Sequence, residues 1–562
     1  MQIAPGTGPS GTPLRLVRFN KTSILFSCAF LFNLALMPLK AYTTEPLPWT
    51  YLVEPTVSVA VGPHETFAAY EARTIAFYRP LYSALEVTTA CNYVYDTNQD
   101  VDILWCPLDL ASNSSFTFVG IPGSTFYSNR ARNWVFAASV GLRNTSDTAL
   151  VELGTLFGQP SSVSAVWIDD SRCIYFAAQL SRGSRTWLYC KFGFRVGMTL
   201  LILYRLWSTY YVHYRSLARA LRRFGAGGFG ERLEIIVGDP TCLILQNTWI
   251  CVLFVIDFWC SLEVVGQCFV RIGQTQNFMT FGLATLYLSR TVWFAYLTLN
   301  VSGYVVRRMA SEHRCAQADP TSVAVVVAIA VGPMTYLQLR IPFFIDVYHF
   351  LFTCILPSER YWDYKEDALP VLFYSMLVGF LPLAYGFGMP VLRSALYRLR
   401  QVVWVRTTVA AVDHSLRRLS LVITRTLPTA SMAIEDEDEF GQVSFNDWKH
   451  RILFALVFGC CRPKARVPKI YKGGSIYLLF STHRHYQRNA AFSFRGSDCY
   501  VISHMTTGVT SYRLSLIDAL HLPRHAGIAC GVCPTSAFGH IAYDKDGVAT
   551  LEYGTDGSHW IL

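Results

Sequence analysis

Of the ionisable residues inside apolar stretches of this 562-residue chain, three lie at similar depth: Asp257, Arg290 and Arg205. A charge at bilayer depth is expensive, so such residues mark either an ion path or a structural pair. Asp257 and Arg290 would each lie about 18–20 Å along a helix from the same membrane surface, and we expect them to form a buried pair. Arg205 reaches a similar depth and is a rival partner. The simpler interpretation is that these charges hold helices in register, and the functional one is a path for ions or protons.

A shorter apolar segment, residues 341–356, contains Asp346 and His349. It is too short to cross the bilayer core of about 30 Å comfortably as a helix, so we expect it to lie at the interface or to re-enter. This position makes it a candidate pore segment, with Asp346 and His349 as its polar groups. If the segment spanned instead, the C-terminal tail would lie on the opposite side.

Enzyme signatures are missing from the sequence: it has no Gly-rich phosphate loop, nucleophile elbow or HExxH motif. One CxxC, at Cys530 and Cys533, is too sparse to predict zinc. We therefore assign no catalytic residue, no metal and no cofactor, and predict a non-enzymatic protein. The net charge of +10 could suit nucleic acid, but the arginines cluster beside apolar segments, where they act as topology signals. No nucleic-acid partner is expected.

Six apolar stretches would have to position these residues. The chain is 52% hydrophobic and only 15% charged, whereas soluble domains carry about 25% charged residues. Arginines gather at every proposed inner flank, as the positive-inside rule requires. We predict a polytopic α-helical membrane protein with six transmembrane helices and cytosolic termini, in the plasma membrane or an endomembrane. The proposed spans are 22–39, 192–212, 241–270, 278–305, 322–339 and 368–392.

The first of these stretches has two interpretations. Residues 22–39 follow Arg15, Arg18 and Lys21, so they suit an uncleaved anchor behind a cytosolic tail of residues 1–21. A basic start and a short apolar core are also the pattern of a cleaved signal peptide. Both interpretations place the following segment outside.

Residues 41–190 are predicted to form an α+β outer domain with disulfides and glycans. Sequons at Asn113 and Asn144 are candidate glycosylation sites in an exported segment. An even number of cysteines in an oxidising compartment predicts two disulfides, in any of three pairings. The four cysteines are Cys91, Cys106, Cys173 and Cys190.

On the cytosolic side we predict a basic linker region, residues 393–474, and a small α+β domain, residues 475–562. Cys460 and Cys461 stand between an apolar patch and a basic run, which suits palmitoylation near anionic lipid. The alternative is a packed helix with two buried thiols. Residues 540–544 and 548–553 flank a turn sequence and predict a β-hairpin.

Two soluble domains on opposite sides of a membrane domain, residues 192–392, favour a receptor or scaffold that couples an outer ligand or protein partner to the tail. The alternative is a cation channel or transporter. The layout resembles polycystin-type and mucolipin-type channels in topology alone: those families place a disulfide-bearing outer domain after the first span and a pore loop before the last. Neither family's selectivity filter is present here, so no filter residue is carried over. The bilayer is the one partner implied by composition, and the oligomeric state stays open.

Overall fold

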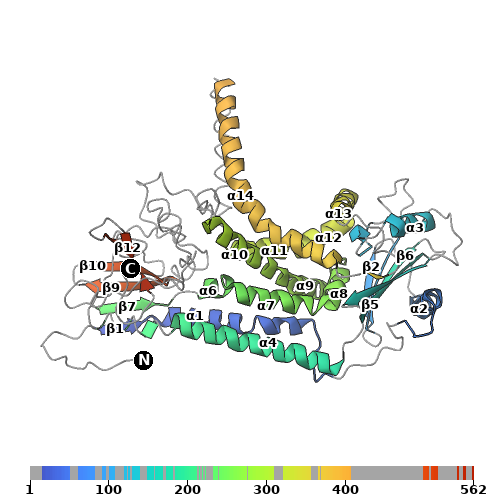
Figure 1. Cartoon of the computed structure of the whole chain (residues 1–562), viewed down its shortest axis with the longest axis horizontal. Coiled ribbons are helices and arrows are strands. Elements are labelled where there is room, and N and C mark those ends of the chain that lie inside the picture. Colours follow the sequence, from blue (N-terminus) through green and yellow to red (C-terminus); the bar gives the residue numbers. More distant parts are fainter. Residues whose placement is uncertain are drawn as a thin grey trace.

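Two β-sheets lie at opposite ends of a layer of helices (Figure 1). The computed structural model describes residues 16–50, 61–82, 91–96, 100–107, 129–139, 149–156, 159–168, 173–180, 184–211, 232–237, 240–274, 276–308, 320–355, 365–366, 369–406, 498–505, 508–516, 541–543, 549–551 and 560–561, with a few shorter pieces between them.

The first sheet has six strands, and five of them come from one section of the chain. All neighbouring strands are antiparallel except β4 and β8. Helices α2 (Phe67–Tyr82) and α3 (Asn129–Ser139) accompany the sheet, and together they form what we call the six-stranded domain. The strand order is β2 (Asn92–Asp96), β3 (Val101–Pro107), β6 (Cys173–Leu180), β5 (Gln159–Ile168), β4 (Ala149–Leu156) and β8 (Lys365–Glu366).

The six-stranded sheet buries both of its faces. Along β3, Ile103 and Trp105 pack with Tyr78 of α2 on one face. Leu104, which points to the other face, packs in a second core with Val270 of α8 (Leu262–Ile272). Because successive side chains of a strand point to opposite faces, the sheet lies between α2 and the helical layer.

The second sheet has five strands and joins three distant regions of the chain. Its order is β1 (Leu16–Phe19), β7 (Arg232–Ile236), β9 (Asp498–Met505), β10 (Gly508–Leu516) and β13 (Trp560–Ile561). Strands β1 and β7 are parallel, and the other pairs are antiparallel. Nearby, β11 (Ile541–Tyr543) and β12 (Ala549–Leu551) pair antiparallel, which confirms the predicted hairpin.

Helix α1 (Lys21–Ala35) begins directly at the five-stranded sheet. The Asn20 side chain caps this helix by accepting from the Ser23 backbone N–H at 2.9 Å, and its amide donates to Glu234 of β7 at 2.8 Å. An Asn at this position satisfies one of the donors that a helix start leaves unpaired. One residue therefore ties α1 to the sheet and starts the helix.

The other helical elements pack mainly around one apolar core, which includes Leu34, Ile202, Phe254 and Tyr296. Helix α14 begins beside α12 and α13, packs against α10, and then extends away from the other helices (Figure 1). These elements are η1 (Pro38–Thr43), η3 (Ser124–Phe126), α4 (Arg185–Leu206), η5 (Trp207–Tyr211), α6 (Thr241–Leu245), α7 (Thr248–Trp259), α8, α9 (Phe278–Leu288), η6 (Ser289–Thr291), α10 (Val292–Arg308), α11 (Pro320–Ile329), η8 (Ala330–Met334), α12 (Thr335–Arg340), α13 (Pro342–Ile355) and α14 (Leu369–Arg406).

The prediction of a fold with six transmembrane helices is wrong. Within the described residues, two helical stretches are long and apolar enough to cross a bilayer, Pro320–Arg340 and Val371–Leu396. A third would count only if Thr248–Trp259 and Leu262–Ile272 formed one span, and these two helices are bent by 73°.

Each of the remaining predicted spans fails for a physical reason. Helix α1 has 15 residues, which rise about 22 Å and fall short of a core of about 30 Å. Helix α4 carries four basic residues, Arg185, Lys191, Arg195 and Arg205. The stretch 278–305 is interrupted by the 3₁₀ turn η6, which contains Arg290.

Candidate functional site

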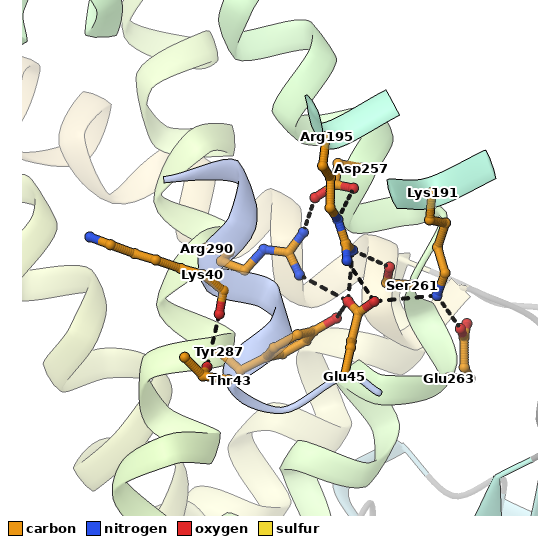
Figure 2. A network of polar contacts seen from close by, with 10 residues as sticks. All are labelled: Lys40, Thr43, Glu45, Lys191, Arg195, Asp257, Ser261, Glu263, Tyr287 and Arg290. Carbon is orange, nitrogen blue, oxygen red and sulfur yellow. Dashed lines mark hydrogen bonds and ion pairs between the residues drawn. The ribbon is translucent and has the colours of Figure 1, made fainter. Parts of the chain in front are cut away.

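Three acids and three bases meet where α7 turns into α8 (Figure 2). We call this set the ion-pair network. Its side chains range from fully buried, at Arg195, to 12% exposed, at Glu263. Because the charges cancel, the helices enclose a neutral group and avoid an uncompensated buried charge. The members are Glu45, Asp257, Glu263, Lys191, Arg195 and Arg290.

The bend between α7 and α8 brings the network together. Ser261 occupies the N-cap of α8 without making a side-chain capping hydrogen bond, and its hydroxyl accepts from Arg195 Nη2 at 3.1 Å. Glu263 lies in the first turn of α8, where the helix dipole favours an acid. The break in the apolar stretch is thus the place where polar groups from other helices enter.

Glu45 is the central acceptor of the network. Its carboxylate accepts from both terminal nitrogens of Arg195 at 2.8 Å and from the Tyr287 hydroxyl at 2.6 Å. Burial alone would raise the pKa of Glu45, but the charge and hydrogen bonds of Arg195 and the charge of Lys191 outweigh it and hold that pKa well below its usual range. Glu45 is therefore held as a carboxylate.

Asp257 and Arg290 lie in contact, and Arg290 Nη2 donates to Asp257 Oδ2. Arg195 Nε also donates to Asp257 at 2.8 Å, whereas Arg205 is not among the partners of Asp257. Sequence reasoning considered Arg205 and missed Arg195. The spacing held a usable signal, because Lys191 and Arg195 are four residues apart and so share one face of α4.

Glu45 was also missed, because residues 41–190 were treated as one outer domain. It follows η1, in the segment that leads from α1 towards the six-stranded domain. Only the folded chain places this segment against α4 and α9. Sequence spacing gives no sign of that contact.

A second buried charge pair attaches the six-stranded sheet to α8. Asp102 of β3 is fully buried and accepts from Arg271 Nε at 2.9 Å, Gln267 Nε2 at 2.7 Å and the Tyr93 hydroxyl at 2.5 Å. Charged hydrogen bonds of this kind are stronger than neutral ones. Helix α8 therefore touches the network at Glu263 and holds the sheet at Gln267 and Arg271.

A cavity of about 400 Å³ separates these two clusters. This volume falls in the range of small-molecule pockets, about 300–1,000 Å³. Among the residues that the structure describes, no group of three or more His, Cys, Asp or Glu could hold a metal ion. The polar lining includes Thr44, Glu45, Asp100, Lys191, Glu263, Gln267, Arg271 and Thr280.

The predicted pore segment forms α13 and contacts the six-stranded domain. Asp346 accepts from Arg132 of α3 at 2.9 Å, and its side chain is 47% exposed. His349 Nδ1 lies 3.3 Å from the Thr125 carbonyl oxygen, and burial lowers the pKa of this histidine. Neither residue lines the cavity beside the network.

A disulfide joins Cys91 and Cys106, at the start of β2 and on β3. Cys173 is a buried free thiol, and Cys190 is an exposed one on α4. Cys106 and Cys173 belong to the cores on opposite faces of the sheet, so the alternation of the strands keeps them apart. The other predicted sites, Asn113, Asn144, Cys460 and Cys461, lie outside the described residues.

Comparison of the chain with protein-family models, with curated proteins and with solved structures gave no match. The function must therefore be argued from the geometry of this site.

Proposed function

We propose that this protein is a membrane-embedded receptor or scaffold without enzymatic activity, in which the ion-pair network couples the six-stranded domain to the five-stranded sheet. One observation carries the proposal: Glu45, in the segment after α1, is bound by Arg195 of α4 and Tyr287 of α9. Helix α1 starts at β1, and α4 precedes β7 along the chain. A displacement at Glu45 would therefore reach two neighbouring strands of the distant sheet.

A continuous set of contacts supports this coupling. It begins at Asp102 of the sheet, which is held by Arg271 of α8. On the same helix Glu263 contacts Lys191 of α4 at 3.3 Å, and Lys191 lies 3.4 Å from Glu45. Contiguity alone is not coupling, which requires an effect at one end to be measured at the other.

Exposed apolar side chains on the helical layer support its placement in a membrane. Large exposed apolar patches are rare on soluble monomers, and exposed apolar side chains occur here on α1, α4, α7 and α14. Exposed large side chains include Leu25, Phe32, Trp187, Leu200, Leu201, Tyr204, Trp207, Trp249, Phe380 and Leu392.

The channel alternative gains no support from α13. Asp346 contacts Arg132 of α3 in the six-stranded domain, and His349 contacts Thr125 of η3. These contacts suit a helix that holds the domain in place.

The test is hydrogen–deuterium exchange on the full chain in lipid nanodiscs, comparing the native protein with Asp102→Asn. This change removes the charge that holds Arg271 at the six-stranded sheet. We expect faster exchange in β7, β9 and β10, at the opposite end of the molecule. The matched control is Arg73→Gln, which breaks the 2.9 Å ion pair with Glu65 on the side of the sheet that packs α2.

Faster exchange confined to the six-stranded domain in Asp102→Asn would contradict the proposal. Equal effects of both variants on the distant sheet would contradict it too, because they would indicate general destabilisation.

A further inference from the structure

We infer that the cavity beside the network binds a small zwitterion that carries a primary ammonium group and a carboxylate or phosphate group. This rests on the proposed function in one respect, since it names the class of ligand that such a receptor would take. Binding itself can be measured whether or not the two sheets are coupled.

Three residues on one face of α8 set the polarity of the cavity. Glu263, Gln267 and Arg271 follow one another at four-residue spacing and all line it. Residues at this spacing share a helix face, and the two ends of the row lie about 12 Å apart. The cavity thus has an acid at one end and a guanidinium at the other.

The acidic end lacks a hydrogen-bond donor. Glu263 Oε1 lies 3.3 Å from Lys191, but Oε2 is buried without a hydrogen-bond partner among the described residues. The Thr44 hydroxyl, which belongs to the same lining, is also without a partner there. A carboxylate oxygen only accepts, so the missing partner is a donor, as an ammonium is. Rotation of the terminal carboxylate is a soft motion and can present either oxygen to the cavity.

At the basic end, Arg271 has a donor group that Asp102 does not use. Arg271 uses Nε and Nη2 to bind Asp102 at 2.9 and 3.3 Å. Its Nη1 makes no hydrogen bond within the described part of the chain, and 14% of the side chain is exposed. A guanidinium fork suits the planar geometry of a carboxylate or phosphate. An anionic group therefore fits this end.

Charges of both signs line the cavity and favour a ligand that carries both. The lining includes the acids Glu45, Asp100 and Glu263 and the bases Lys191 and Arg271. A ligand with a single charge would leave the opposite end of the cavity without a partner. A zwitterion gives each end a partner of opposite charge.

The experiment is calorimetric titration of the full chain in phosphatidylcholine nanodiscs. The zwitterionic probes are 4-aminobutanoate and glycerophosphoethanolamine, and the single-charge controls are ethanolamine and butanoate. We expect at least one zwitterion to bind about tenfold more tightly than either control. Equal binding of controls and zwitterions, or no zwitterion binding up to about 10 mM, would overturn the inference.

A second series uses nanodiscs that contain phosphatidylethanolamine, whose head group carries the same two charges. Weaker binding of the free probes there would assign the site to a lipid head group. Unchanged binding would assign it to a free zwitterion.

Two variants locate the binding. Glu263→Gln keeps the shape of the side chain and removes the acceptor charge, and we expect affinity to fall about tenfold. Thr280→Phe fills the cavity from α9 without touching a charge, and we expect binding to be lost, which keeps the test decisive if Glu263→Gln does not fold. The control, Glu65→Gln, lies in the six-stranded domain away from the cavity and should bind as the native chain does. If Thr280→Phe binds the zwitterion with the affinity of the native chain, the ligand does not bind in this cavity.

The result can be separated from the coupling experiment. Zwitterion binding without any effect of Asp102→Asn on the five-stranded sheet would contradict the receptor proposal and would still support the binding site.

Discussion

The two sheets of this protein are built in opposite ways. Strands β2 to β6 of the six-stranded sheet come from residues 92–180, and a disulfide joins Cys106 of β3 to Cys91, directly before β2. The five-stranded sheet brings together residues 16–19, 232–236 and 498–561. Contacts between distant residues require more loop closure before they stabilise the fold. Strands β2 to β6 can pair within their own section, whereas the five-stranded sheet can form only when β1, β7 and β9 come together from distant parts of the chain.

The largest expected effect is that of Arg195→Ala. It removes the partner of two buried carboxylates, Glu45 and Asp257, and should destabilise the helical layer by about 3–5 kcal/mol. Hydrogen exchange should accelerate strongly in β7 and β9 and only slightly in β3 and β6. Equal acceleration in both sheets would show that the two sheets do not differ in their dependence on the helices.

Removing the disulfide should affect the six-stranded sheet more than the five-stranded sheet. The double substitution Cys91→Ala with Cys106→Ala opens a loop of 15 residues, for which chain entropy predicts a loss of about 3 kcal/mol. We expect the six-stranded domain to unfold at a lower denaturant concentration. The fluorescence of its tryptophans measures this transition. Replacing the exposed Cys190 by Ala is the control and should leave the transition unchanged.

Asn20→Ala should act on the five-stranded sheet with a smaller effect. The change removes the cap of α1 and the bond to Glu234, and caps contribute about 1 kcal/mol. Exchange should rise in the first turn of α1 and in β7. Unchanged protection of β7 would show that the capping residue does not hold the sheet to the helix.

Acid should produce the smallest effect, through Glu45. The pKa of this carboxyl is lower in the folded state than its ordinary value near 4.5, so its stabilising contribution is complete above that value and declines as the pH falls below it. Between about pH 5 and pH 4 we expect a loss below about 1 kcal/mol. Thermal unfolding of the native chain should therefore depend on pH more steeply than that of Glu45→Gln, and parallel curves would contradict this.

Local patterns predicted the elements better than their assembly. The hairpin of β11 and β12 follows from a turn sequence between two short β-type runs, and residues 322–339 and 368–392 coincide with the two stretches that could span a bilayer. Hydropathy failed at α7 and α8, because an apolar composition does not report a bend of 73°. At that bend Ser261 accepts a hydrogen bond from Arg195, which comes from another helix.

The candidate site shows the same division. The sequence alone determined that Asp257 and Arg290 are costly charges in apolar surroundings, because each sits within its own apolar stretch. Only the tertiary structure decided that Glu45, Lys191 and Arg195 join them and that Arg205 is not a partner of Asp257. The physical reason is that a buried charge specifies its need for a counter-charge, while the chain path through space decides which residue meets that need.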